Sequence, residues 1–213
     1  MDYILMLLPS MLKGLTVTLK LFFLTLMAAL PLGILMGMAR ISKFKPLKWF
    51  MEFYVWLFRG TPLLLQLLFM YFGLMTIGIR LEREIAAYLA FVLNSSAYLA
   101  EIFRAGIQSI DRGQYEAADV LGLSRFQTMK NIILPQVFKL VLPPMGNEVI
   151  NLVKDTALIY VLAISELSRV ARTHVMRDDT FVPFIIAAIF YLFMTGTVQQ
   201  FFKWLESRFD YYR

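Results

Sequence analysis

The 213-residue chain contains no cysteine and only one histidine, His174. The absence of cysteine excludes a disulfide framework and a thiolate metal site, and one histidine cannot form a histidine metal cluster, so we expect no metal site. The chain also lacks the phosphate-binding pattern G-x-x-x-x-G-K-[ST], and a single histidine leaves no credible Ser–His arrangement. We therefore expect a protein that is not an enzyme and that holds no cofactor of its own.

Charged residues are also scarce, at 17% against about 25% in typical soluble domains. Hydrophobic residues make up 59% of the chain, and the mean hydropathy is +0.66. This composition predicts an all-α integral membrane protein with a single transmembrane domain over residues 1–213. The net charge of +6 could indicate nucleic-acid binding, but the basic residues lie between apolar runs rather than along one solvated face. We expect the basic residues to lie in cytoplasmic loops, and we expect no nucleic-acid partner.

Five apolar segments have the length of a membrane span, which takes about 20 residues. They are expected at about 14–39, 56–79, 85–107, 137–164 and 181–205. Residues 3–12 are too short to span and are expected to form an interfacial lead-in helix, and residues 165–180 a polar loop. Gly33 and Gly37 in the first span are four residues apart, which favours close packing of another helix there.

The basic residues are distributed unequally between the two sides of this arrangement. Most of them lie in the connector after the first span, in the stretch 104–139 and in the C-terminal tail. The positive-inside rule assigns these regions to the cytoplasm. The N-terminus is then expected outside and the C-terminus inside the cell.

One polar unit, residues 111–135, interrupts the apolar pattern on the cytoplasmic side. Asp111 with Gln114, and Ser124 with Gln127, each have the form of a capping box, so two short helices are expected. Gly122 is expected to end the first helix in a left-handed conformation, and Pro135 is expected to break the second after residue 133.

The first of these helices has too little apolar surface to be stable alone. It places Glu116 and Asp119 on one side, with the small residues Ala117 and Ala118 close by. We expect it to dock into a partner, which small residues allow to approach closely. The alternative is an ordinary amphipathic loop helix that lies on the bilayer.

Polar residues recur inside two of the expected spans, where charge is costly and therefore typical of a functional site. In the fourth span they fall within a stripe of about 120° made of Asn147, Glu148, Asn151, Lys154 and Asp155. Pro143, Pro144 and Gly146 lie at the start of this stripe and are expected to break or kink the helix.

The third span carries a matching line with Asn94, Tyr98, Glu101 and Ala105 at heptad-like spacing. Two facing stripes could bind a zwitterion, with Lys154 for its carboxylate and Asp155 or Glu148 for its ammonium. The residues expected to contact a substrate are Asn94, Tyr98, Glu101, Glu148, Asn151, Lys154, Asp155 and Thr156. The alternative is that Lys154 and Asp155 neutralise each other or a neighbouring helix, and that Glu101 pairs with Arg104.

Six segments resemble the permease subunits of ATP-binding cassette (ABC) importers, of the polar amino-acid (histidine, glutamine, arginine) subfamily. They are FRGTPLLLQLLFMYFG, LNSSAYLAEIFRAGIQSI, EAADVLGLS, ILPQ, LPPMGNE and LVKDTAL, in register from about residue 14 to residue 205. The resemblance implies the type I importer permease fold in a bacterial cytoplasmic membrane. It also implies that the polar unit is a coupling helix in the groove of a separate ATPase subunit, which binds ATP and Mg, with contacts from Glu116, Ala117, Ala118, Asp119 and Gly122.

The resemblance further implies import of a polar amino acid, with basic amino acids among the candidates, by alternating access. An extracytoplasmic binding protein would deliver the amino acid, and a second permease chain, identical or a close paralogue, would complete the path across the lipid bilayer. Two other classes remain open. An ion-coupled carrier would use Lys154 and Asp155 as a titrating pair, and a membrane scaffold would need only the docking helix.

Overall fold

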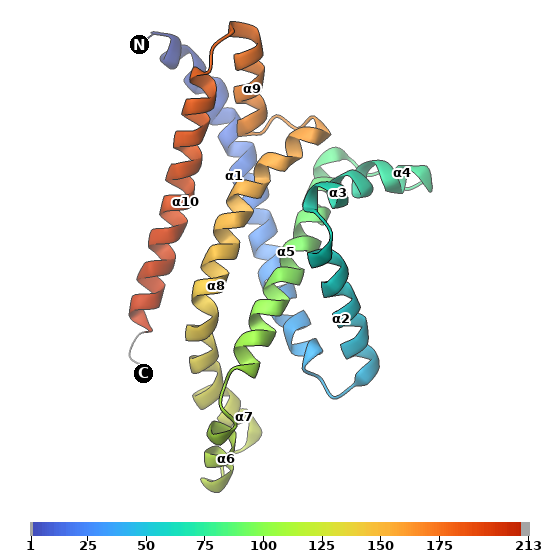
Figure 1. Cartoon of the computed structure of the whole chain (residues 1–213), viewed down its shortest axis with the longest axis vertical. Helices are drawn as coiled ribbons and strands as arrows, with labels where there is room; N and C mark the ends of the chain where they lie inside the picture. The colour runs from blue at the N-terminus through green and yellow to red at the C-terminus, as the bar shows by residue number, and fades with distance from the viewer. Residues whose placement is uncertain (1, 210–213) are drawn as a thin grey trace.

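The computed structural model describes residues 2–209, and within them the chain is helical with no strand (Figure 1). The elements in order are α1 (Asp2–Arg40), α2 (Lys45–Gly60), α3 (Leu63–Leu68), a π-helical turn (Phe69–Gly73), α4 (Leu74–Thr76), α5 (Arg83–Gln108), α6 (Arg112–Val120), α7 (Arg125–Thr128), a second π-helical turn (Met129–Ile133), α8 (Leu134–Asp155), a 3₁₀ helix (Thr156–Leu162), α9 (Leu167–Asp178) and α10 (Val182–Arg208).

Helix α5 lies at the centre of the bundle and packs against α1, α2 and α8, while α8 also packs against α10. By length and composition, α1, α5 and α10 qualify as membrane spans among the described residues, and the bent pair of α2 with α3–α4 gives a fourth. Helix α8 runs beside them but carries the polar stripe. The all-helical membrane fold is therefore confirmed, and α5 and α10 match the third and fifth predicted spans.

Helix α1 corrects the prediction of a separate lead-in helix, because it runs without interruption from residue 2 to residue 40. Its buried residues continue at heptad-like spacing through Leu7 and Met11 into the span, and α9 packs against it. The predicted small-residue face is confirmed. A Cβ on Gly33 would lie 2.5 Å from the Cβ of Leu99, and one on Gly37 would lie 3.0 Å from the carbonyl oxygen of Ala100.

The second predicted span, 56–79, falls largely within a bent pair of helices. The chain is already helical from Lys45, within the predicted connector, and α2 then bends by 104° into α3–α4. The residue before a proline is held out of the helical region, and Thr61, before Pro62, is extended at φ −118° and ψ 144°. Figure 1 shows α3 and α4 projecting sideways from the bundle.

Helix α8 and the 3₁₀ helix after it cover most of the fourth predicted segment, 137–164, and the helix is not broken at its prolines. Helix α8 continues through Pro143 and Pro144, which lie on its exposed side. The residues around them pack into the bundle: Leu142 is fully buried, and a Cβ on Gly146 would lie 3.0 Å from the ring of Phe202 in α10. The buried face of α8 therefore packs against its neighbours without a break at the prolines.

The predicted polar loop 165–180 is instead a helix, α9. Its N-cap is Glu166, which is fully buried and accepts hydrogen bonds from the backbone N–H groups of Ser168 and Arg169, each at 2.6 Å. Burial raises the pKa of Glu166, and these donors oppose the shift. The N–H of Leu167 donates to Thr18 Oγ1 at 3.2 Å, which ties α9 to α1. Glutamate is not a preferred N-cap, so the sequence signal was weak.

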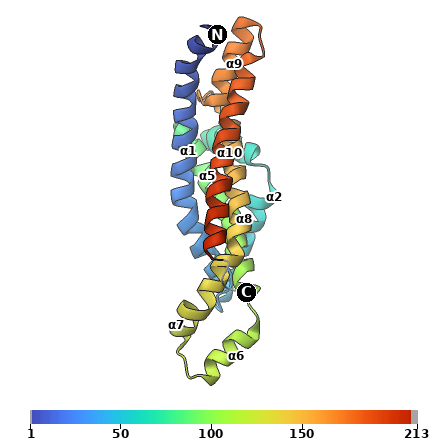
Figure 2. The same ribbon diagram turned by 90° about the vertical axis from the view of Figure 1, so that its left-hand side faces the viewer.

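Different helices lie at the two ends of the bundle. The start of α1 lies beside α9 at one end, and α6 and α7 extend beyond the helices at the other, as Figure 2 shows. Helix α10 begins at the α9 end and runs toward the α6 end. The described chain therefore places its first and last helical residues toward opposite ends, as an odd number of spans requires.

Candidate coupling surface and translocation path

The α6 unit forms at the predicted residues, with one correction to its capping. Asp111 caps α6, because its Oδ1 accepts from the N–H of Gly113 at 2.7 Å. The side chain of Gln114 does not complete a box with it, since its Oε1 accepts from Gln136 Nε2 at 3.3 Å and so contacts α8 instead. Gly122 adopts φ +69°, the left-handed conformation that was predicted for the end of this helix.

The second capping box, Ser124 with Gln127, is confirmed in both of its hydrogen bonds. The predicted helix break at Pro135 is wrong, because α7, the π-helical turn and α8 follow one another without a gap. A proline removes one backbone donor and its ring crowds the carbonyl four residues earlier. The wider π turn at 129–133 accommodates both effects and lets the helix continue.

The exposed side of the α6 unit carries both the predicted residues and large apolar ones. Glu116, Ala117 and Asp119 are exposed, whereas Ala118 is fully buried and faces the rest of the chain. Val120 is 87% exposed, and Leu121 and Phe126 are 74% and 73% exposed. Apolar side chains this exposed are typical of a surface that another protein covers.

A groove of about 760 Å³ opens beside this surface, between α6 and the start of α8. Its lining includes Ala117 from α6, Leu121 at the C-cap of α6, and Gln136 and Leu140 from α8. The α6 helix is therefore held at an angle to α8 by a few side-chain contacts, and its outer face remains free among the described residues.

The polar stripe of α8 lies on the open side of the helix. Asn147, Asn151 and Lys154 are exposed, and Glu148 and Asp155 are half-buried. Thr156 is placed differently, because it is fully buried and its Oγ1 donates to the carbonyl oxygen of Val153 at 2.6 Å. The structure therefore brings together five of the predicted residues on one face and turns Thr156 into the bundle.

Asn94 on α5 forms hydrogen bonds at the bend between α2 and α3. Its Nδ2 donates to the carbonyl oxygen of Phe58 at 3.1 Å and to Gln66 Oε1 at 3.0 Å. Gln66 Nε2 in turn donates to Phe58 O, Thr61 O and Thr61 Oγ1. These bonds satisfy carbonyl groups that the bend leaves without helical partners. Gln66 was not singled out from the sequence, although a lone glutamine in the apolar run 63–69 was the available signal.

Glu101 on α5 is surrounded by three arginines. It forms ion pairs with Arg40 at the end of α1 and with Arg104, whose Nε is 3.1 Å from Glu101 Oε2, and Arg59 NH1 lies 3.7 Å from the same oxygen. The pairing with Arg104 was the alternative interpretation of the sequence, whereas Arg40 and Arg59 were not expected there. The guanidinium of Arg59 also lies over the ring of Tyr98, 5.3 Å from its centroid.

Helices α2, α5 and α8 together place charges of both signs beside one open face. Arg59 and Asp155 both lie within electrostatic range of Glu148, and Lys154 lies within range of Asp155. Such a surface can bind a ligand that carries an ammonium and a carboxylate. Among the described residues, no group of three or more His, Cys, Asp or Glu side chains could hold a metal ion.

Comparison with known proteins identifies relatives along nearly the whole chain. Residues 29–211 match the family described as "Binding-protein-dependent transport system inner membrane component". The arginine transport system permease protein ArtQ of Bacillus subtilis is 42% identical over 185 residues, 86% of this chain and 84% of ArtQ. The probable amino-acid ABC transporter permease protein YckA of the same organism is 37% identical over 205 residues, 96% of this chain and 91% of YckA.

Solved structures agree with this relationship. A chain in the crystal structure of an amino acid ABC transporter with histidines superposes with a TM-score of 0.89 at 38% identity, and the match covers 97% of both chains. A chain of the inward-facing MetNI methionine ABC transporter superposes with a TM-score of 0.74 at 17% identity, which supports the fold alone. The chain therefore belongs to the family of binding-protein-dependent transport system inner membrane components, as a multi-pass permease subunit of an ABC importer with the type I fold.

Proposed function

We propose that this subunit moves a polar amino acid across the cytoplasmic membrane, with basic amino acids as the first candidates. The observation that carries the proposal is the 38% identity, over 97% of both chains, to a chain of an amino acid ABC transporter with histidines. The half-buried carboxylates Glu148 and Asp155 on the open face of α8 supply the negative charge that a cationic substrate needs.

Energy for transport comes from an ATPase subunit that docks on the exposed side of α6. Glu116, Ala117 and Asp119, together with the exposed Val120 and Leu121, form the contact surface. The α7 helix, the π turn and α8 form one continuous helical rod that carries the polar stripe. A movement of the docked subunit is therefore transmitted to the stripe, which is the requirement for alternating access.

The open stripe of α8 is closed by a second permease chain, either an identical copy or a close paralogue. Asn151 and Lys154 are exposed although they lie in a helix of the membrane domain, and polar groups at membrane depth require a protein or aqueous environment. With the α6 end in the cytoplasm, the N-terminus lies outside, and an extracytoplasmic binding protein delivers the substrate at the α9 end.

Within this path we assign the substrate carboxylate to Lys154 and its ammonium or cationic side chain to Glu148 and Asp155, with Asn151 as a further polar contact. Asn94, Tyr98, Glu101 and Thr156 stay predictions as substrate contacts. The present contacts of Asn94, Tyr98 and Glu101 hold the bend and the arginine cluster in place, and Thr156 donates to the carbonyl oxygen of Val153. A substrate would have to displace these partners.

The test uses the reconstituted transporter with its ATPase subunits and binding protein in proteoliposomes. Asp155→Asn and Lys154→Met are expected to weaken substrate-stimulated ATP hydrolysis by about tenfold, as for the loss of one charge-assisted contact. Gln200→Asn, on the exposed side of α10, is the control. Unchanged substrate dependence in both stripe variants would contradict the assignment, and transport by the purified chain alone on an ion gradient would favour a carrier.

A further inference from the structure

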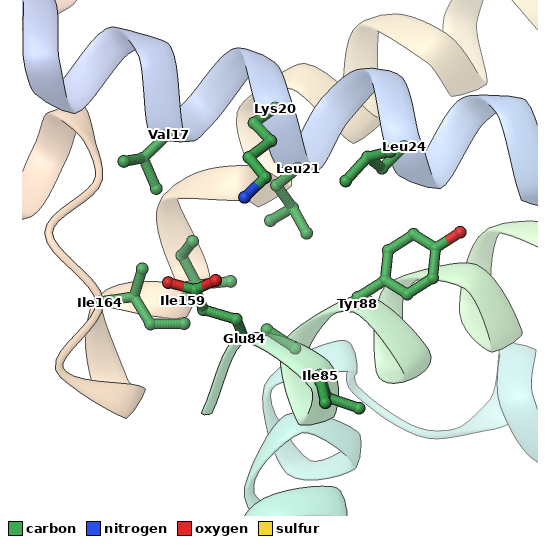
Figure 3. A pocket seen from close by; sticks show the side chains of 10 residues that line it. Val17, Lys20, Leu21, Leu24, Glu84, Ile85, Tyr88, Ile159 and Ile164 are labelled. Atoms are coloured by element: carbon green, nitrogen blue, oxygen red, sulfur yellow. The ribbon is translucent and has the colours of Figure 1, made fainter. Parts of the chain in front are cut away.

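A pocket of about 270 Å³ lies between α1, the start of α5 and the 3₁₀ helix, and no residue of the polar stripe lines it. Figure 3 shows the ammonium of Lys20 and the carboxylate of Glu84 pointing into it from opposite walls. The rest of the lining is largely apolar and includes Val17, Leu24 and Ile159. Two opposite charges therefore share one small cavity with apolar walls.

Neither charge has a partner among the described residues. Lys20 and Glu84 form no salt bridge or side-chain hydrogen bond there, and both side chains are exposed in the open cavity. Two unpaired charges of opposite sign in one cavity can be paired by a ligand that carries the complementary two charges.

The position of the pocket along the membrane normal places it near the lipid headgroups. Lys20 precedes Arg40 by twenty residues on α1, and Glu84 precedes Arg104 by twenty residues on α5. At about 1.5 Å per residue each interval is about 30 Å, the thickness of the hydrocarbon core. If the two arginines mark one interface, Lys20 and Glu84 lie at the other, the one away from α6 and α7.

The rim of the pocket is apolar as well. Leu24 is 44% exposed and Ile85 is 46% exposed, and both line the opening. Acyl chains can lie against these side chains while a headgroup enters the cavity.

We propose that this pocket binds the zwitterionic headgroup of an aminophospholipid, with Lys20 on the phosphate and Glu84 on the primary ammonium. The choice between a lipid and a free zwitterion follows from the apolar rim and the interfacial height. The inference stands on the membrane-spanning fold and is independent of which amino acid the subunit transports.

The experiment is native mass spectrometry of the intact permease–ATPase complex in mild detergent. The complex is supplied with equal amounts of phosphatidylethanolamine, phosphatidylcholine and phosphatidylglycerol, and separately with free arginine. Wild type is expected to retain phosphatidylethanolamine in preference to the other two lipids. Lys20→Gln and Glu84→Gln are each expected to lower that retention by about tenfold, as for the loss of one charge-assisted hydrogen bond.

Lys13→Gln and Glu82→Gln are matched controls, because both residues are exposed on the same helix or at its cap and do not line the pocket. They are expected to leave retention unchanged. Equal retention of all three lipids by wild type would overturn the proposal without any variant, as would unchanged retention in both pocket variants. Retention of arginine that depends on Lys20 and Glu84, without lipid selectivity, would assign the pocket to a free zwitterion and overturn the lipid assignment.

Discussion

The chain passes two prolines that follow helical segments, Pro62 and Pro135, and it responds to them in opposite ways. At Pro62 the helix ends and the path bends by 104°. At Pro135 the helix continues, with a π-helical turn just before the proline. Proline removes one backbone N–H donor at both sites. The difference therefore lies in which groups donate hydrogen bonds to the carbonyl groups that are left without a helical partner.

At Pro62, side chains from two helices donate hydrogen bonds to the carbonyl groups that the bend leaves without helical partners. Asn94 of α5 and Gln66 of α3 both donate to the carbonyl oxygen of Phe58, and Gln66 also donates to Thr61. At the second site the backbone itself adjusts through the π turn. A bend at membrane depth needs polar side chains from a neighbouring helix, whereas a bulge needs none.

The largest effect is expected from removing the side chains that support the bend. Gln66→Leu combined with Asn94→Leu leaves the carbonyl groups of Phe58 and Thr61 without these side-chain donors in the membrane domain. We expect a loss of about 3 kcal/mol in the free energy of unfolding, measured by denaturant titration in detergent. Gln199→Leu combined with Gln200→Leu, on the exposed side of α10, is the control. Equal stability of the two double variants would show that the bend does not depend on these bonds.

The next effect concerns coupling rather than stability. Pro135→Ala restores a backbone donor and lets the π turn close into a regular α-helix. Because a π turn holds about one residue more than an α turn, closing it would rotate α6 and α7 by about 100° relative to α8. We expect substrate-coupled ATP hydrolysis to fall on the order of tenfold while the fold is retained. Pro183→Ala at the start of α10 is the control, and wild-type coupling in Pro135→Ala would refute a role for the π turn.

A smaller effect is expected at the cap of α7, which begins the helix that leads to Pro135. Ser124→Ala removes the oxygen that accepts from the N–H of Gln127 at 3.3 Å. The expected loss of stability is about 1 kcal/mol, measured by thermal unfolding of the purified complex. Ser124→Asn should retain most of the stability, because asparagine is an equally good cap. A loss as large for asparagine as for alanine would mean that the hydroxyl is needed for something other than capping.

The smallest effect is expected from Pro62 itself. If Gln66 and Asn94 hold the bend, Pro62→Ala should keep it and should cost no more than about 1 kcal/mol, mainly through the unfolded state. The chain has no cysteine, so spin labels placed on Trp49→Cys and Thr76→Cys report the distance between α2 and α4, which increases if the bend opens, by pulsed electron resonance. A straightened helix in Pro62→Ala would show that the proline, rather than its neighbours, causes the bend.

Local features were largely predictable from the sequence because their causes lie within a few residues. The Ser124 capping box and the left-handed Gly122 formed as expected, since both depend on neighbours at fixed spacing. The polar stripe of α8 and the small-residue face of α1 also followed from helical periodicity. The family itself was recognisable from short segments in register.

Partners distant in sequence could not be predicted in the same way. Nothing near Glu101 indicates that Arg40 reaches it from the end of α1. Likewise, nothing near Asn94 indicates that it completes a bend between two other helices. The continuation of α1 to residue 2 and the formation of α9 depend on the contact between these two helices, which periodicity does not reveal.

The sequence by itself determined that this chain is a helical membrane protein, where most of its spans lie and which short unit is available for a partner. These properties follow from hydropathy, spacing and capping, which act over a turn or two of helix. Only the tertiary structure decided that one proline bends the chain and another does not, and which charges meet. The reason is that buried polar groups are satisfied by whichever side chains the packed helices bring close, and that packing is a property of the whole bundle.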